Sequence, residues 1–273
     1  MQYPQTKLPS VGLTIFSKMS ALAAEKSAIN LSQGFPDYQG PKALLDSVAK
    51  QVAAGMNQYA PMSGMPALRR LIADKVERLY GRSVNPDTEI CVTPGATEAL
   101  FSAIASTVRA GDEVIIFDPA YDSYRPAVEL NGGVPISLSL MPPKFAIDWD
   151  ALRAAITPRT RMIIVNTPHN PTGQAWSAED LDSLEAAVRD TNILILSDEV
   201  YEHLIFDGLE HQSMNRRPVL AERSFIVSSF GKTYHVTGWR VGYCVAPAAL
   251  MSELQKVHQY VTFNTHTPLQ CAI

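Results

Sequence analysis

A lysine, a serine and an arginine lie close together in this sequence, in an order that suits covalent chemistry on an anionic aldehyde. Lys232 ends the segment Ser-Ser-Phe-Gly-Lys, which contains Ser229, and Arg240 follows eight residues later in Thr-Gly-Trp-Arg-Val-Gly. The amine of a lysine can form a Schiff base with an aldehyde, while a hydroxyl and a guanidinium can hold an anionic group beside it. The segment therefore predicts a covalent anchor at Lys232 with an anion site next to it.

Two further polar segments directly follow short apolar runs rich in β-branched residues. Asn-Thr-Pro-His-Asn-Pro-Thr-Gly occupies residues 166–173, and Ser-Asp-Glu-Val-Tyr occupies residues 197–201. An aspartate just after a buried strand, such as Asp198, is costly to leave unpaired, although the same residue type is common as a helix or turn cap. Asn166 ends its strand, and capping of the loop explains it as well as a functional role does.

A third segment, Thr-Pro-Gly-Ala-Thr-Glu at residues 93–98, ends an expected strand and opens an expected helix. Glycine lets the backbone approach a ligand closely, and the free N–H groups of a first helical turn suit a phosphate. In isolation the segment is a common strand-to-helix turn with proline near the start of the helix. Beside the lysine segment it predicts phosphate binding by Gly95, Ala96 and Thr97.

The spacing of apolar residues predicts the elements that must position these groups. Helices are predicted over residues 12–26, 41–54, 64–80, 95–109, 121–131, 177–190 and 247–260. Strands are predicted over residues 90–93, 113–117, 134–140, 161–166, 193–197, 224–228 and 240–245. The central runs are apolar on both faces, as expected of strands covered by helices. The pattern predicts a doubly wound α/β domain with ligands at the carboxyl ends of its strands.

Taken together, the three motifs resemble, in order and approximate spacing, the pyridoxal-phosphate (PLP) site of the class I and II aminotransferases. Asn-Gln-Tyr-Ala-Pro-Met at residues 57–62, with segments 166–170 and 228–235, is most similar to the methionine aminotransferases of the kynurenine-transaminase branch. The resemblance implies a three-layer PLP-transferase large domain with a mostly parallel seven-stranded sheet. It also implies PLP-dependent transfer of an amino group from a sulfur-containing or aromatic L-amino acid, with methionine favoured, to a 2-oxo acid through a Schiff base (aldimine) at Lys232.

The resemblance also assigns roles to individual residues. Lys232 carries PLP and shuttles a proton, Asp198 keeps the ring nitrogen protonated, and Tyr201 with Asn170 hydrogen-bonds the phenolic oxygen. These roles make Lys232, Asp198 and Tyr201 the catalytic set. The implied cofactor-binding set is Tyr59, Gly95, Ala96, Thr97, Tyr121, Asn170, Asp198, Tyr201, Ser229, Lys232 and Arg240.

Several implied contacts also have a plainer explanation. Tyr121 would stack on the pyridine ring, but a tyrosine at the start of a helix is also an ordinary core residue. Gly34 and Asn170 would contact the substrate, although the Gly-Phe-Pro around Gly34 is also a simple turn. Ile15 and Phe16 are candidates for an apolar wall around the substrate side chain, and a buried helix explains them equally well.

The family also implies an organisation for the whole chain. Residues 1–40 would form an N-terminal arm with part of the small domain, and residues 41–273 the PLP-binding large domain. Family members continue into a small C-terminal domain that carries the arginine for the substrate carboxylate, so we expect this chain to be truncated and that domain to be largely missing. Tyr59 matches a position that reaches into the neighbouring subunit, which implies a homodimer with shared active sites.

Bulk properties agree with a metabolic enzyme in the cytoplasm. The chain has 273 residues, 46% of them hydrophobic, and a net charge of −4 without a basic block, which argues against nucleic-acid or membrane partners. No apolar stretch approaches the roughly 20 residues that a membrane helix needs, and no signal peptide is expected at the N-terminus. The three scattered cysteines indicate reduced thiols, with no metal site or disulfide framework.

Other functions remain open at this point. A PLP-dependent β-lyase acting on cysteine conjugates would use the same lysine and diverge only after proton abstraction. The chain is also compatible with an inactive truncated fragment. A PLP-binding regulator would need a DNA-binding module ahead of the arm, and the sequence starts almost directly at the arm.

Overall fold

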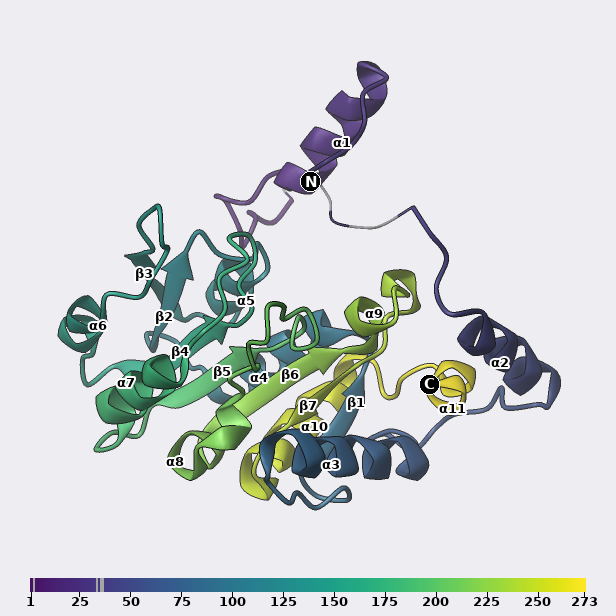
Figure 1. The fold of residues 1–273 in the computed structure, drawn as a ribbon. Coiled ribbons are helices and arrows are strands. Elements are labelled where there is room, and N and C mark those ends of the chain that lie inside the picture. Colours follow the sequence, from purple (N-terminus) through teal and green to yellow (C-terminus); the bar gives the residue numbers. More distant parts are fainter. Residues whose placement is uncertain (2, 33, 35–36) are drawn as a thin grey trace. The chain divides into compact units, whose positions relative to one another are not determined.

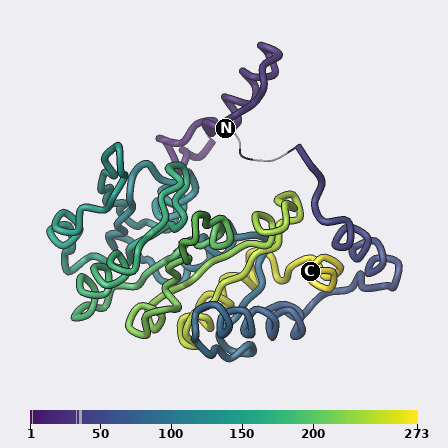
Figure 2. The backbone as a smooth tube through the Cα atoms, in the orientation of Figure 1, coloured from purple at the N-terminus to yellow at the C-terminus, as the bar shows by residue number. Residues whose placement is uncertain are grey.

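The computed structural model describes residues 1, 3–32, 34 and 37–273, which form two compact units, Met1–Gln39 and Gly40–Ile273. The first unit contains helix α1 (Ile15–Glu25), whose N-cap Thr14 accepts a hydrogen bond from the N–H of Ser17. Figure 2 follows the backbone of both units. Gln33, Phe35 and Pro36, which belong to the predicted substrate loop, lie outside the described residues.

The second unit is built on a sheet of seven strands (Figure 1). Its order is β1-β7-β6-β5-β4-β2-β3, in which β7 runs antiparallel to both of its neighbours and every other pair is parallel. The predicted α/β fold with a mostly parallel, seven-stranded sheet is therefore confirmed. The strands are β1 (Ile90–Thr93), β2 (Glu113–Asp118), β3 (Val134–Ser139), β4 (Thr160–Asn166), β5 (Leu194–Asp198), β6 (Ser224–Ser229) and β7 (Gly242–Val245).

Helices cover both faces of the sheet. One face packs against α4 (Ala96–Thr107), α5 (Tyr124–Leu130) and α10 (Ala248–Val261). The other face packs against α3 (Pro66–Tyr80), α6 (Trp149–Ala155), α7 (Ala178–Val188), α8 (Pro218–Ala221), α11 (Thr267–Ala272) and the 3-10 turn η1 (Met214–Arg216). The remaining elements of the unit are α2 (Lys42–Ala53), α9 (Phe230–Thr233) and the 3-10 turn η2 (Thr237–Trp239).

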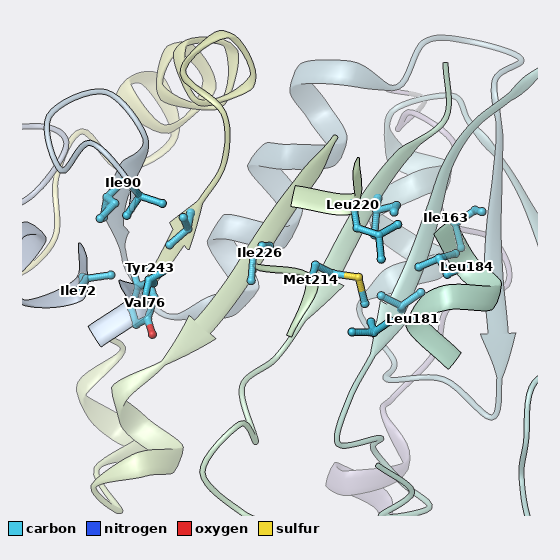
Figure 3. Packing of buried hydrophobic residues seen from close by; sticks show 14 of the residues in the cluster. Ile72, Val76, Ile90, Ile163, Leu181, Leu184, Met214, Leu220, Ile226 and Tyr243 are labelled. Atoms are coloured by element: carbon cyan, nitrogen blue, oxygen red, sulfur yellow. The ribbon is translucent and has the colours of Figure 1, made fainter. Parts of the chain in front are cut away.

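Strand β2 shows how one run of apolar residues contributes to the core on both faces of the sheet. Val114 and Ile116 belong to the core cluster under α4, whereas Ile115 and Phe117 belong to the cluster under α3 and α7. Side chains of a strand alternate between the two faces, so a run that is apolar throughout buries both faces at once. Figure 3 shows the second cluster, where Ile163 of β4 lies near Leu181 and Leu184 of α7, with Met214, Leu220 and Ile226 beside them.

Observed and predicted elements differ in short helices and, by more than one residue, in the start of one strand. Each predicted strand overlaps an observed one, but α6, α8 and α9 were not predicted because each spans seven residues or fewer and carries little periodicity. The predicted strand 240–245 begins only at Gly242. Arg240 has φ 53° and ψ 55°, a left-handed conformation that interrupts an extended strand.

The topology gathers the polar segments at one edge of the sheet. Because β7 is antiparallel to β6 and β1 is antiparallel to β7, β1 runs in the same direction as β6. The carboxyl ends of β1, β2, β4, β5 and β6 therefore share an edge, and β7 begins at that same edge. Every motif that the sequence predicts to be functional in this unit lies in a connection at this edge, except the loop around Tyr59.

The close packing at the start of β7 leaves no space for a side chain at Gly242. A Cβ there would lie 2.7 Å from the backbone N of Ala96 and from the carbonyl carbon of Gly95, and 2.9 Å from the carbonyl oxygen of Ser228. Backbone atoms cannot retreat as a flexible side chain can, so Gly242→Ala should lower the free energy of unfolding by about 1–3 kcal/mol. Urea unfolding measures the change.

The matched control is Gly238→Ala in η2, where an added Cβ has nothing within 4 Å. This variant should unfold close to the wild-type urea midpoint. Equal midpoints for both alanine variants would contradict the close contact between β7 and the first turn of α4.

Candidate active site

The edge of the sheet brings most of the predicted site residues together. Asp198 ends β5 and Tyr201 follows it, while Lys232 lies on α9 directly after β6. The remaining groups come from the ends of other strands: Gly95, Ala96 and Thr97 after β1, Tyr121 after β2, Asn170 after β4, Ser229 at the end of β6, and Arg240 before β7.

Asp198 is a buried carboxylate without a buried cation bonded to it. Its side chain is 4% exposed, and it accepts hydrogen bonds from the hydroxyl of Tyr124 at 2.7 Å and from the N–H of Val200 at 3.2 Å. Burial raises the pKa of Asp198 from 3.8 to about 6, although these two donors and the more distant charge of Lys232 act in the opposite direction. A positively charged group against its oxygens would relieve the cost of burying this charge.

Tyr124 is a site residue that the sequence did not reveal. It is 3% exposed, and burial together with the neighbouring Asp198 holds the pKa of its hydroxyl well above the usual range, so it stays a donor. Its ring meets that of Tyr121 edge to face, with centroids 5.6 Å apart. The signal available in the sequence was the spacing of three residues between Tyr121 and Tyr124, which places both on one side of a helix start.

The amine of Lys232 lies near Tyr201, and its charge reaches Asp198. Its Nζ atom is 5.3 Å from the centroid of the Tyr201 ring, within the range of a cation–π contact. The positive charge of Lys232 also acts to lower the pKa of Asp198. The turn that carries the lysine is tight, because a Cβ on Gly231 would lie 3.0 Å from the Cα of Thr237.

Arg240 and the amino end of α4 form a positively charged cradle. A Cβ on Gly95 would lie 2.6 Å from Nη2 of Arg240, so the guanidinium lies directly against the backbone at the helix start. That guanidinium donates to two neutral oxygens, Thr237 O at 3.2 Å and Thr97 Oγ1 at 3.4 Å. A helix N-terminus and a cation repel each other, and an anion bound between them turns this repulsion into attraction.

The predicted anion ligand Ser229 closes its own turn. It is 8% exposed, its Oγ accepts from the N–H of Gly231 at 3.2 Å, and the same hydroxyl donates to the carbonyl of Val241 at 3.3 Å. The structure thus ties the end of β6 to the residue before β7. Ser229 holds the lysine turn and the Arg240 segment at a fixed separation.

Asn166 connects the ends of two strands. Its Nδ2 donates to the carbonyl of Asp198 at 2.9 Å, and its Oδ1 accepts from the N–H of Asn170 at 2.7 Å. Both polar atoms of the side chain are therefore engaged with backbone, which agrees with a capping role. Asn166 sets the position of Asn170 relative to Asp198.

Tyr59 lies outside this group, and three other predicted residues belong to the first unit. Tyr59 is 82% exposed, and its ring meets Phe263 edge to face, with centroids 5.4 Å apart. Gly34 belongs to the first unit, as do Ile15 and Phe16 of α1. In that helix, no described residue is buried.

Metal and membrane features are absent from the part of the chain that the structure describes. Its residues contain no group of three or more His, Cys, Asp or Glu side chains suited to hold a metal ion. None of the helices in residues 1, 3–32, 34 and 37–273 has the length and apolar character needed to cross a bilayer.

Comparison with known proteins gives consistent matches. The sequence model of the family described as aminotransferase class I and II matches residues 26–272. The methionine aminotransferase of Escherichia coli is 55% identical over 270 residues, covering 99% of this chain and 70% of that protein. The kynurenine–oxoglutarate transaminase of Dictyostelium discoideum is 36% identical over 288 residues, covering 99% of this chain and 66% of that protein.

A solved structure matches the fold along the whole chain. The crystal structure of YbdL from Escherichia coli, reported with a methionine aminotransferase function, superposes with a TM-score of 0.96 at 54% identity. The match covers 100% of this chain and 71% of that one.

The raised pKa of Asp198 predicts a specific dependence of stability on pH. The folded protein raises this pKa from 3.8 to about 6, so between these values it binds more protons than the unfolded chain does. Asp198 therefore contributes stability at low pH that is lost as pH rises through about 6, amounting to ~3 kcal/mol in full. The free energy of unfolding of Asp198→Asn should consequently rise relative to wild type across this range.

Urea unfolding of the ligand-free proteins from pH 4 to 7 measures this difference. Asp190→Asn, which alters an exposed carboxylate after α7, should stay parallel to wild type throughout. A constant difference between Asp198→Asn and wild type would show that Asp198 is not a costly buried charge.

Proposed function

This chain belongs to the class I and II aminotransferase family, and from that premise we propose that its donor is a sulfur-containing or aromatic L-amino acid, methionine favoured, with a 2-oxo acid as acceptor. The observation that carries the proposal is the amine of Lys232 near Tyr201 and within electrostatic reach of the buried carboxylate of Asp198 at the edge of the sheet. The Escherichia coli relative named methionine aminotransferase supports methionine, and the kynurenine–oxoglutarate transaminase supports an aromatic alternative.

The cofactor of this family is PLP, and the residues of the second unit fit it. When bound, PLP supplies an aldehyde for an amine, and its protonated pyridine ring withdraws electrons from the Cα of the substrate. The cradle of Gly95 and Arg240 has the charge for a phosphate, since the guanidinium lies against the backbone at the start of α4, where a Cβ on Gly95 would be 2.6 Å from its Nη2. Asp198 fits a protonated ring nitrogen. Among the described residues, two groups donate hydrogen bonds to its buried carboxylate, and both are neutral. We assign PLP binding to Gly40–Ile273 on these grounds.

Each group of the chain then has a defined task. Lys232 Nζ would hold the cofactor covalently and, as a free amine, would move a proton from the substrate Cα. Asp198 would keep the ring nitrogen protonated, and Tyr124 orients Asp198 through its hydrogen bond. Tyr201 and Asn170 would hydrogen-bond the phenolic oxygen, and Tyr121 would stack on the ring. The contacts of Gly34 and Asn170 with the substrate stay predictions.

We also propose a homodimer in the cytoplasm. Tyr59 is a large aromatic residue, yet it is 82% exposed. Phe263 (45%), whose ring meets that of Tyr59, and the nearby Tyr260 (86%) and Val261 (49%) add further exposed apolar surface. Exposed apolar groups that gather in this way are typical of an interface, and Tyr59 would enter the site of the second subunit. The free thiols of Cys91, Cys244 and Cys271 support a reducing compartment.

The assignment of Lys232 predicts both a covalent adduct and an activity. Incubation with PLP and reduction with borohydride should fix the cofactor to Lys232, and peptide mapping identifies the labelled residue. Lys232→Ala should lose the adduct and lower the formation of 2-oxo acid from methionine by ~10³-fold or more. Lys256→Ala, which removes an exposed lysine paired with Glu253, is the matched control and should behave as wild type.

Two outcomes would contradict the proposal. Label on Lys256, or on no lysine, would remove Lys232 from the chemistry. Release of ammonia and a thiol from cysteine conjugates, with no 2-oxo acid formed from methionine, would replace transfer with elimination.

Shared sites predict complementation between two inactive variants. A Tyr59→Ala chain retains Lys232, and a Lys232→Ala chain retains Tyr59, so a mixed dimer contains one site with both residues intact. Mixing the two variants under conditions that allow subunit exchange should restore part of the activity with methionine, and analytical ultracentrifugation should show a dimer. A fully active monomer, or a mixture no more active than its components, would contradict a shared site.

A further inference from the structure

Glu202 lies directly after Tyr201, and its carboxylate is the centre of a buried polar cluster. The residue is 5% exposed. Its Oε1 accepts from Lys75 Nζ at 2.6 Å, from the hydroxyl of Tyr243 at 3.1 Å and from the hydroxyl of Ser228. Its Oε2 accepts from the hydroxyl of Tyr80 at 2.5 Å. We call these five residues the Glu202 cluster.

The donors come from three elements that meet behind the active site. Lys75 and Tyr80 belong to α3, Ser228 to β6 and Tyr243 to β7. Tyr243 is also part of the buried core beside Ile72 and Val76 of α3 (Figure 3). A shift of the Glu202 carboxylate would therefore disturb the packing of α3 against the sheet.

Each attachment point lies next to a segment of the site. Glu202 follows Tyr201, Ser228 precedes Ser229 and the turn of Lys232, and Tyr243 follows Gly242 at the start of β7. One buried carboxylate thus joins the turn after β5 to both ends of the β6–β7 connection, and these two segments present Tyr201, Lys232 and Arg240. The cluster fixes their relative positions from inside the protein.

Lys75 supplies the charge that this arrangement needs. Its side chain is 16% exposed, and its Nζ lies 5.2 Å from the centroid of the Tyr243 ring and 6.0 Å from that of Tyr80. Burial acts to raise the pKa of Glu202, but Lys75 and the hydroxyl donors outweigh burial and bring that pKa down to about 2. Glu202 therefore stays ionised over the whole range in which an enzyme works.

A second buried carboxylate fixes the other side of the same turn. Glu199 is 1% exposed and accepts from Ser197 Oγ at 2.9 Å, from the N–H of Met214 at 3.0 Å and from His211 Nε2 at 2.8 Å. Glu199 and Glu202 hold the turn at both ends, which leaves Val200 and Tyr201 little freedom between them. The turn has one conformation in which to present Tyr201.

We propose that Glu202, with Lys75 as its counter-ion, is a positioning residue that sets Tyr201 and the Lys232 turn for the bound cofactor. The proposal rests on the function proposed above, since it concerns the same site. A buried ion pair is weak evidence for stability, because well-packed apolar residues often stabilise a core as much. What an apolar pair lacks is the directed hydrogen bonding that joins the turn after β5 to α3, β6 and β7 at fixed angles.

The test compares Glu202→Gln with Glu89→Gln. Glu89 also forms a partly buried ion pair, with Arg82 Nη2 at 3.1 Å, but it precedes β1 and lies at the opposite edge of the sheet from the site. The measurements are the urea midpoint without PLP, the dissociation constant for PLP by equilibrium dialysis, and the pH midpoint of the visible absorbance with PLP bound. Both variants should lose stability.

The two variants should differ in their affinity for PLP and in the pH midpoint of the visible absorbance. Glu202→Gln should weaken PLP binding about tenfold, as loss of an outer partner of a ligating group does, and Glu89→Gln should not. It should also move the absorbance midpoint to higher pH, because a displaced Tyr201 no longer stabilises the anionic phenolic oxygen. In a Tyr201→Phe background the further shift caused by Glu202→Gln should be small, since both changes remove one interaction.

Unchanged PLP affinity and absorbance midpoint in a folded, destabilised Glu202→Gln would overturn the inference and leave the cluster a structural one. If Glu202→Gln does not fold, Tyr80→Phe removes one donor without changing charge, and it should shift both quantities in the same direction by less. Wild-type values in Tyr80→Phe would overturn the inference equally. Failure of the wild-type protein to bind PLP is a separate result, which refutes the proposed function itself.

Discussion

Helices cover both faces of the seven-stranded sheet, and this constraint decides where polar side chains can lie. The middle of a central strand such as β4 must be apolar on both faces, because a polar group there would have no partner. Polar side chains therefore collect where the strands end. The parallel direction of β1, β2, β4, β5 and β6 places these ends along one edge, and the active site is assembled from them.

Two carboxylates, one at the end of β5 and one in the turn that follows, differ in the charge that surrounds them. Glu202 receives an ammonium group and several hydroxyls, and its pKa falls to about 2. Asp198 receives two neutral donors, and burial raises its pKa to about 6. Groups whose surroundings push their pKa values apart have different roles. The carboxylate that is fully compensated holds the turn, and the one left short of positive charge is the proposed partner of the protonated ring nitrogen.

What could be predicted from the sequence was local, and what could not be predicted was long-range. Apolar runs and turn residues located the strands, and the motif order located Lys232, Asp198, Tyr201 and Arg240 at one edge. The bond from Tyr124 to Asp198 spans 74 positions, and that from Lys75 to Glu202 spans 127. No spacing pattern predicts such pairs, because a lysine on a helix, such as Lys75, is expected from the sequence to face solvent. The left-handed conformation of Arg240 was missed for a related reason, since its side chain lies against Gly95, which is 145 positions earlier in the chain.

The antiparallel strand β7 explains how one connection supplies both the proposed covalent anchor and the proposed anion ligand. A parallel partner for β6 would require the chain to cross the sheet, whereas an antiparallel one keeps the whole link from Ser229 to Gly242 at the edge. Lys232 lies in this link, and Arg240 lies at its end. Arg240 adopts a left-handed conformation that costs ~1 kcal/mol for a residue with a side chain. A glycine would avoid that cost but would leave the amino end of α4 without the guanidinium that lies against Gly95, so the strain is the cost of aiming a cation at the anion cradle.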